Sequence, residues 1–249
     1  MLVFIFLIVL VILFLLLGKK ENEGSPTATL PETEITSEIK PEEKSKPKAE
    51  SGKRVLLEVP AVCQFPDLPT GCESVSTAMV LNFYGETVTA KEFFYSWLTA
   101  VDFKTSGGTT TGPHPNDALC GNPDNALGCW AGAVEKAVNT HAKGCCATVL
   151  PGQTLASLCQ NFIRNGKPIV VWATQGMKPE AKGKSWKLPS GENFTWITGE
   201  HCLVLVGYDD DFYYFNDPIS GGVAAFEKGI AEKRFAALGS QALLITEKK

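Results

Sequence analysis

Apolar side chains follow two different periods along the chain, and the change between them predicts the order of helices and strands. After residue 70 they recur every three to four positions, as on one face of a helix. The helices predicted in this way are 72–84, 89–99, 131–138 and 155–163. Beyond residue 167 the apolar residues instead form short unbroken runs typical of buried strands. The predicted strands are 168–172, 202–208, 212–215 and 242–246, with a further strand at 55–59 and a late helix at 226–238.

This order of elements predicts the fold class. Helices that come first and strands that come later describe an α+β domain, with N-terminal helices packed on a C-terminal antiparallel sheet. Residues 104–129, rich in Gly, Thr, Pro, Asn and Asp, are predicted to be loop. Residues 175–199 carry Trp186 and Trp196 among small and charged residues. They predict either a surface loop whose tryptophans tuck against the sheet or a flap that contacts substrate.

The first 53 residues differ in composition from the rest. Residues 1–17 contain no polar or charged side chain, and as a helix the apolar run would span roughly 24 Å of a ~30 Å bilayer core. Residues 1–18 are therefore expected to be a transmembrane anchor or an uncleaved signal. Residues 19–53 mix Glu, Lys, Pro, Ser and Thr without an aromatic residue, which predicts a flexible charged linker. Residues 54–249 are long enough for one domain.

Cysteine usage and charge bear on location and partners. Lys19 and Lys20 follow the apolar run and favour a cytoplasmic domain by the positive-inside tendency. The eight cysteines favour an oxidising exterior, and we give them more weight. We therefore expect a single-pass protein of the cell membrane with an extracytoplasmic domain. A net charge of −4 and the lack of a basic stripe argue against nucleic acid as a partner.

The cysteines offer several pairings. The candidate disulfides are Cys120 with Cys129, Cys159 with Cys145 or Cys146, and Cys63 with Cys202, although the last two could simply be buried. A zinc site is the weaker interpretation, because the chain has no Cys-x2-Cys pair.

Cys72 occupies a chemically unusual position. Thr70 and Glu73 have the spacing of a capping box, which would place Cys72 in the first turn of its helix. Unpaired backbone N–H groups and the helix dipole favour a thiolate there, so we expect a lowered pKa for the Cys72 thiol.

A nucleophilic thiolate also needs a proton acceptor, an orienting group and an oxyanion donor. Of the three histidines, His201 precedes a predicted strand, whereas His114 and His141 lie among loop or polar residues. Asp217 ends the next strand, and a turn at 209–211 would bring it near His201. Gln64, eight residues before Cys72, has a side-chain amide suited to an oxyanion.

Four separate segments resemble the bacterial C39-like cysteine peptidases. They are 57–64, 70–76, 199–209 and 215–218, and the resemblance runs from about residue 55 to residue 245. It implies a papain-like fold and a mechanism without a cofactor or metal. It also implies catalytic roles for four residues: Cys72 as nucleophile, His201 as general base and then acid, Asp217 as its orienting group and Gln64 as oxyanion donor.

The sequence thus predicts a membrane-tethered cysteine peptidase that hydrolyses peptide bonds through a Cys-His-Asp triad. We expect a peptide or protein substrate, a membrane contact through the N-terminal helix, and a monomer. Two alternatives stay open. One is a cell-wall amide hydrolase, which can use a similar set of residues. The other is a binding module that captures a peptide on the same fold without cutting it.

Overall fold

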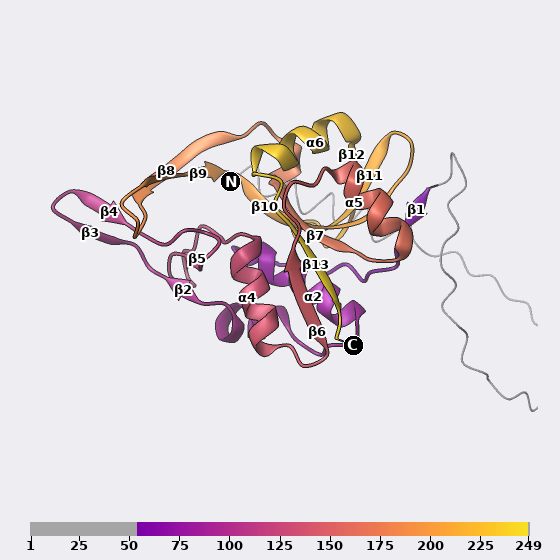
Figure 1. Ribbon diagram of the computed structural model, residues 1–249, viewed down its shortest axis with the longest axis horizontal. Coiled ribbons are helices and arrows are strands. Elements are labelled where there is room, and N and C mark those ends of the chain that lie inside the picture. The colour runs from indigo at the N-terminus through magenta and orange to yellow at the C-terminus, as the bar shows by residue number, and fades with distance from the viewer. Residues whose placement is uncertain (1–53, 249) are drawn as a thin grey trace, which may run out of the picture. The chain divides into compact units, whose positions relative to one another are not determined.

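The computed structural model describes residues 54–248, and a seven-stranded antiparallel sheet lies at the centre of this region (Figure 1). The strand order is β12-β11-β10-β7-β13-β6, with β1 pairing beside β10. The strands are β1 (Val55–Leu56), β6 (Cys145–Val149), β7 (Ile169–Thr174), β10 (Glu200–Tyr208), β11 (Phe212–Asp217), β12 (Gly222–Glu227) and β13 (Ala242–Glu247). The turn between β10 and β11 makes them a hairpin, as the sequence predicts.

Helices cover both faces of this sheet. They are α2 (Cys72–Phe83), α3 (Ala90–Glu92), α4 (Ala131–His141), α5 (Leu155–Asn161) and α6 (Lys228–Ala237), with a π-helical turn η1 (Phe93–Trp97) and 3-10 turns η2 (Ile163–Asn165) and η3 (Gln175–Met177). Alternate side chains of β10 point to opposite faces. Val204 therefore joins the core formed with α2 and α4, whereas Leu203 joins the core formed with α5 and α6. The α+β, papain-like fold is confirmed, with a second helical layer.

Two smaller sheets occupy regions that the sequence predicts as loop. They contain β2 (Ala100–Val101) with β5 (Leu119–Cys120), and β3 (Lys104–Ser106), β4 (Thr109–Thr111), β8 (Ala181–Lys187) and β9 (Asn193–Thr198). The loop prediction for 104–129 is wrong at β3, β4 and β5 and holds for most of the remainder; β3 and β4 escaped it because they carry mostly exposed Thr, Lys and Ser and give no apolar alternation. Residues 175–199 form the β8–β9 hairpin, in which Trp186 and Trp196 are buried.

Element ends differ from the predictions in instructive places. Thr89 caps its helix as expected, because its hydroxyl accepts from the Glu92 N–H at 3.0 Å. Thr70 does not cap α2: Gly71 is the N-cap and supplies no side-chain bond. Phe226, predicted to be helical, lies in β12, and α6 begins after it. Strand β6 was not predicted, since its first three residues are small and only Thr148 and Val149 favour a strand.

All eight cysteines lie in the described part of the chain, and all are free. The disulfide predictions are therefore wrong. Cys145 and Cys159 belong to the cores on opposite faces of the sheet, which keeps them apart. Cys120 packs in a separate cluster with the β8–β9 tryptophans, whereas Cys129 lies in the core beside α2.

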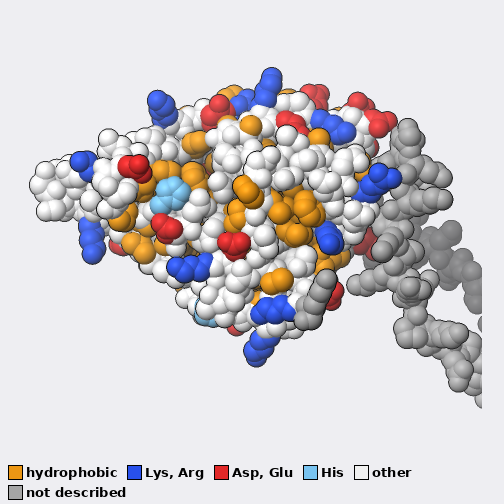
Figure 2. All heavy atoms as spheres, in the orientation of Figure 1, with side chains coloured by type: hydrophobic (Ala, Val, Ile, Leu, Met, Phe, Trp, Pro, Cys, Tyr) orange, Lys and Arg blue, Asp and Glu red, His pale blue; other side chains and the backbone are white. Residues whose placement is uncertain are grey.

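The predictions for residues 1–18 and 19–53 lie outside the described residues. Within residues 54–248, no helix has both the length and the apolar character required to cross a bilayer. On the face of the domain shown in Figure 2, basic and acidic side chains are interspersed among apolar ones.

Candidate active site

The N-terminus of α2 meets the start of β10, and this junction positions the candidate nucleophile. Cys72 is the first residue of α2 and is buried. One turn later, the Ser76 hydroxyl donates to the Cys202 carbonyl of β10 at 3.0 Å. This bond fixes the first turn of α2 against the strand that carries His201.

His201 and Asp217 form a buried pair. His201 Nε2 and Asp217 Oδ1 are 2.7 Å apart, and the two side chains come from the neighbouring strands β10 and β11. Asp217 Oδ1 also accepts from the Ile219 N–H at 2.8 Å. Burial acts to raise the pKa of Asp217, but the hydrogen bond and charge of His201 outweigh it and leave this pKa below its usual value.

Gln64 lies beside the same pair. Its backbone N–H donates to the Pro218 carbonyl at 2.8 Å, next to Asp217. Its side-chain Nε2 donates to the Pro69 carbonyl at 2.7 Å, on the segment that leads into α2. One N–H of the amide is therefore engaged, and the second remains for an oxyanion.

The thiol of Cys72 does not have the environment that the sequence predicts. It donates to Glu73 Oε2 at 3.3 Å rather than to the His201 ring. Burial, followed by the charges of Glu73 and Glu200, raises the pKa of Cys72 well above its usual value. The predicted lowering of the Cys72 pKa is wrong, because burial and the charges of two carboxyl groups outweigh the effect of the helix N-terminus.

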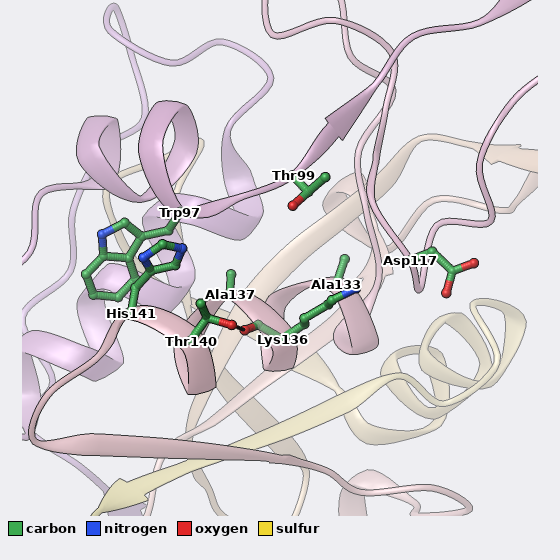
Figure 3. Close-up of a pocket in the computed structure, with 8 residues that line it drawn as sticks. All are labelled: Trp97, Thr99, Asp117, Ala133, Lys136, Ala137, Thr140 and His141. Carbon is green, nitrogen blue, oxygen red and sulfur yellow. Dashed lines mark hydrogen bonds between the residues drawn. The ribbon is translucent and has the colours of Figure 1, made fainter.

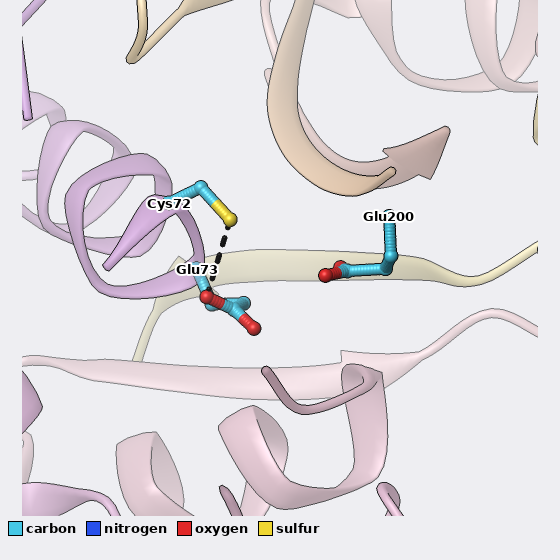
Figure 4. Close-up of side chains that lie close together, drawn as sticks. All are labelled: Cys72, Glu73 and Glu200. Carbon is cyan, nitrogen blue, oxygen red and sulfur yellow. Dashed lines mark hydrogen bonds between the residues drawn. The ribbon is translucent and has the colours of Figure 1, made fainter. Parts of the chain in front are cut away.

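Glu73 and Glu200 are the site residues that the sequence analysis missed. Glu73, interpreted as half of a capping box, instead turns inward, and its Oε1 accepts from the Cys129 N–H at 2.6 Å. Glu200 immediately precedes His201 and lies beside Glu73 (Figure 4). Burial raises the pKa of both carboxyl groups, and the charge of Glu73 raises that of Glu200 further. The available signal was two acidic residues directly adjacent to the candidate nucleophile and base.

A glycine makes room for these two carboxyl groups. Gly128 has a φ of +137°, and a Cβ there would lie 2.6 Å from Glu73 Oε1 and 2.8 Å from Glu200 Oε2. The next residue, Cys129, supplies the N–H for Glu73 and accepts from Trp172 Nε1 at 2.8 Å. The loop before α4 is therefore part of the site.

The other two histidines have local packing partners. His114 contacts the rings of Trp130 and Phe194 at centroid distances of 5.5 and 5.4 Å. His141 stacks on Trp97 at the wall of a pocket of about 190 Å³ (Figure 3). None of the four predicted catalytic residues lines that pocket.

Comparisons with known proteins found one curated relative, similar solved structures and one matching family. The uncharacterized protein YvpB of Bacillus subtilis (strain 168) is 32% identical over 182 residues, which cover 72% of this chain and 70% of YvpB. The crystal structure of a proposed C39-like peptidase from Bacillus anthracis superposes with a TM-score of 0.69 at 26% identity, covering 79% of this chain and 99% of that one.

A double glycine motif protease from an AMS/PCAT transporter, solved in complex with the leader peptide, shares 18% identity and a TM-score of 0.42 over 78% of this chain and 93% of that one. That likeness is too weak for a comparison of sites. The model of the Peptidase_C39 like family matches residues 56–243. The chain therefore belongs to the Peptidase_C39 like family.

Proposed function

We propose that this protein is a cysteine peptidase that uses Cys72, His201, Asp217 and Gln64. The observation that carries the proposal is the buried 2.7 Å contact between His201 and Asp217, because α2, which begins at Cys72, packs against the strand that carries His201. A carboxylate that holds an imidazole in one orientation is what a general base needs. Membership in a peptidase family supports the same chemistry.

The hydrogen bonds assign the two nitrogens of His201 different tasks. Nε2 is held by Asp217, so Nδ1 is the nitrogen that accepts a proton. For reaction, the Cys72 side chain turns from Glu73 toward the ring and passes its proton to Nδ1. The thiolate then attacks the substrate carbonyl carbon, and the carbonyl electron pair moves to its oxygen. The Cys72 backbone N–H and the second N–H of Gln64 stabilise that oxyanion.

The same imidazole completes the cycle. The imidazolium donates its proton to the leaving amine, and the C–N bond breaks to leave a thioester on Cys72. Water then loses a proton to Nδ1 and attacks the thioester carbonyl. Breakage of the C–S bond releases the carboxylic acid product, and the proton returns to Cys72. Throughout, Asp217 balances the charge that develops on His201.

Cleavage assays separate this function from its rivals. The full-length protein is incubated with an unstructured polypeptide mixture and, separately, with purified peptidoglycan, and the products are mapped by mass spectrometry. We expect polypeptide cleavage that disappears in Cys72→Ala and persists in Cys63→Ser, which changes an exposed cysteine. Cleavage of peptidoglycan alone would instead identify a cell-wall amide hydrolase.

One observation favours the non-cleaving alternative. The Cys72 thiol donates to Glu73 and not to His201, so in this arrangement the thiol has no hydrogen bond to the base that cleavage requires. A module that only captures peptides would bind a peptide with the same affinity before and after prolonged incubation and would release no fragments. Recovery of only intact peptide when binding is saturated would support the non-cleaving alternative.

We further propose that the apolar residues 2–17 tether the protein to the cell membrane, with residues 19–53 as a linker and the domain on the extracytoplasmic side. The uninterrupted apolar run supports this proposal. Protease added to intact cells tests it: digestion of the domain is expected, and protection that ends only on lysis would reverse the orientation. Recovery of the full-length protein in the non-membrane fraction would contradict the tether.

A further inference from the structure

Two carboxyl side chains converge on the candidate nucleophile. The thiol sulfur of Cys72 and one carboxylate oxygen each from Glu73 and Glu200 all lie within 4.8 Å of one another. They come from two elements, α2 and β10, whose relative position is fixed by packing and by the Ser76 hydrogen bond. Figure 4 shows the two carboxyl groups turned toward each other, with the sulfur close to Glu73.

No lysine or arginine side chain of residues 54–248 forms an ion pair with this cluster. The Lys and Arg ion pairs among residues 54–248 are made by other carboxylates. A further ion pair joins His201 to Asp217 instead of to this cluster.

One carboxylate oxygen of the cluster is an unsatisfied hydrogen-bond acceptor. Glu200 Oε1 has less than 1 Å² of accessible surface and lacks a hydrogen-bond partner in the described part of the chain. A buried acceptor without a partner is costly, and buried polar groups are nearly always satisfied. Figure 4 shows the carboxyl group of Glu200 turned toward Glu73. The unpartnered oxygen of Glu200 therefore indicates that this cluster binds a cation or a hydrogen-bond donor.

We propose that Cys72, Glu73 and Glu200 form a binding site for a thiophilic divalent cation such as Zn²⁺, and that the bound cation withdraws the nucleophile from reaction. Binding replaces the proton on the Cys72 sulfur with the metal, and that proton leaves to solvent. The sulfur lone pair then bonds the metal and no longer attacks a carbonyl. The site depends on the peptidase assignment only for its effect on cleavage, because binding involves no substrate.

The geometry suits zinc better than a hard cation. With Zn–S near 2.3 Å and Zn–O near 2.1 Å, neighbouring ligands of a tetrahedral site are about 3.5 Å apart. Cys72 Sγ and Glu73 Oε2 are already 3.3 Å apart. A rotation of Glu200 toward them completes a three-ligand set. The thiolate selects soft metals over Mg²⁺ and Ca²⁺, which prefer oxygen ligands alone.

Cobalt absorption and thiol protection test the site without requiring turnover. Reduced, metal-free, full-length protein is titrated with Co²⁺, whose bond to a thiolate gives a charge-transfer band. In parallel, alkylation of Cys72 by iodoacetamide at about pH 8 is followed by peptide mapping with and without Zn²⁺. We expect a Co²⁺ band and at least tenfold slower alkylation of Cys72 with Zn²⁺.

Matched variants identify the ligands. Glu200→Gln keeps the size of the side chain and removes its charge, so it should weaken Zn²⁺ protection by roughly tenfold or more. Glu192→Gln, at an exposed carboxyl, should behave like the parent protein. Where Glu200→Gln proves unfolded by circular dichroism, Glu200→Asp keeps the charge with a shorter reach and should bind more weakly than the parent protein.

Three results would overturn the site: a Co²⁺ band that survives in Cys72→Ser, Zn²⁺ protection equal in Glu200→Gln and the parent protein, or no Zn²⁺ effect on Cys72. The last would mean that Glu73 and Glu200 only share a proton. A protein that binds Co²⁺ through Cys72 and Glu200 yet cleaves no peptide would contradict the peptidase assignment and keep the cation site.

Discussion

Replacing Asp217 by asparagine isolates the charge that orients His201. The variant keeps the shape of the side chain and one acceptor oxygen, but it loses the negative charge that faces Nε2 at 2.7 Å. The amide can also present its NH₂ group to the ring, which stabilises the wrong imidazole tautomer. Turnover should fall roughly 10²- to 10⁴-fold, which is about 3–5 kcal/mol of transition-state stabilisation.

The same substitution should lower stability in a pH-dependent way. A hydrogen bond to a charged group contributes about 1.5–3 kcal/mol to the free energy of unfolding. The free energy of unfolding of the variant should therefore be lower by that amount at pH 7. Because the folded pKa of Asp217 is below its usual value, its contribution is complete above the unfolded pKa of about 3.9. It is lost as the pH falls through the lower folded pKa, so the two proteins should converge in stability under acid.

Steady-state kinetics and urea unfolding measure both effects. kcat is determined on the peptide that the parent protein cleaves best, and unfolding is followed at neutral pH and below about pH 4. Asp210→Asn, an exposed change in the β10–β11 turn, serves as the matched control and should change neither value. An unchanged kcat in folded Asp217→Asn would refute the role of this carboxylate, and a constant stability difference across pH would refute the linkage.

Three further substitutions test the site and the packing of the domain. Ser76→Ala removes the bond between α2 and the Cys202 carbonyl, and it should cost about 1–2 kcal/mol in urea unfolding; no loss would show that this bond does not hold the two elements together. Gly128→Ala places a Cβ against Glu73 in a backbone conformation that alanine avoids, so a lower Tm by several degrees is expected, and an unchanged Tm would contradict the crowding. Glu232→Ala removes the carboxylate that accepts from two N–H groups at the start of α5, with an expected loss of about 1–2 kcal/mol by thermal unfolding; equal stability would mean that water replaces it.

Sequence patterns predicted the parts of the fold that carry strong local signals. The helix at Cys72 and the buried strands near His201 are long and apolar, and their periods predict helix and strand directly. Polar strands such as β3 and β4 are held by pairing with distant segments, so no local window shows them. The false disulfides have a similar cause, since only the three-dimensional packing shows that Cys145 and Cys159 belong to different cores.

The sequence predicted the approach of His201 and Asp217, but it predicted neither the part played by Glu73 and Glu200 nor the electrostatics around Cys72. Spacing and the hairpin turn were sufficient to bring His201 and Asp217 together. The direction of the Cys72 pKa depended on burial and on Glu200, which lies 128 positions away in the sequence and next to Cys72 only after folding. Glu73 could equally have faced its own backbone as a cap, and tertiary contact with Cys129 decides otherwise.

Labelling by a peptide vinyl sulfone tests the central claim that Cys72 is a nucleophile served by His201. Full-length protein and His201→Ala are treated in parallel, and the modified cysteines are located by peptide mapping. The account predicts modification of Cys72 in the parent protein and a large loss of that modification in His201→Ala, with the exposed Cys63 reacting equally in both. Modification of Cys72 that is absent, or that proceeds equally without His201, would contradict the assignment of this site as a catalytic centre.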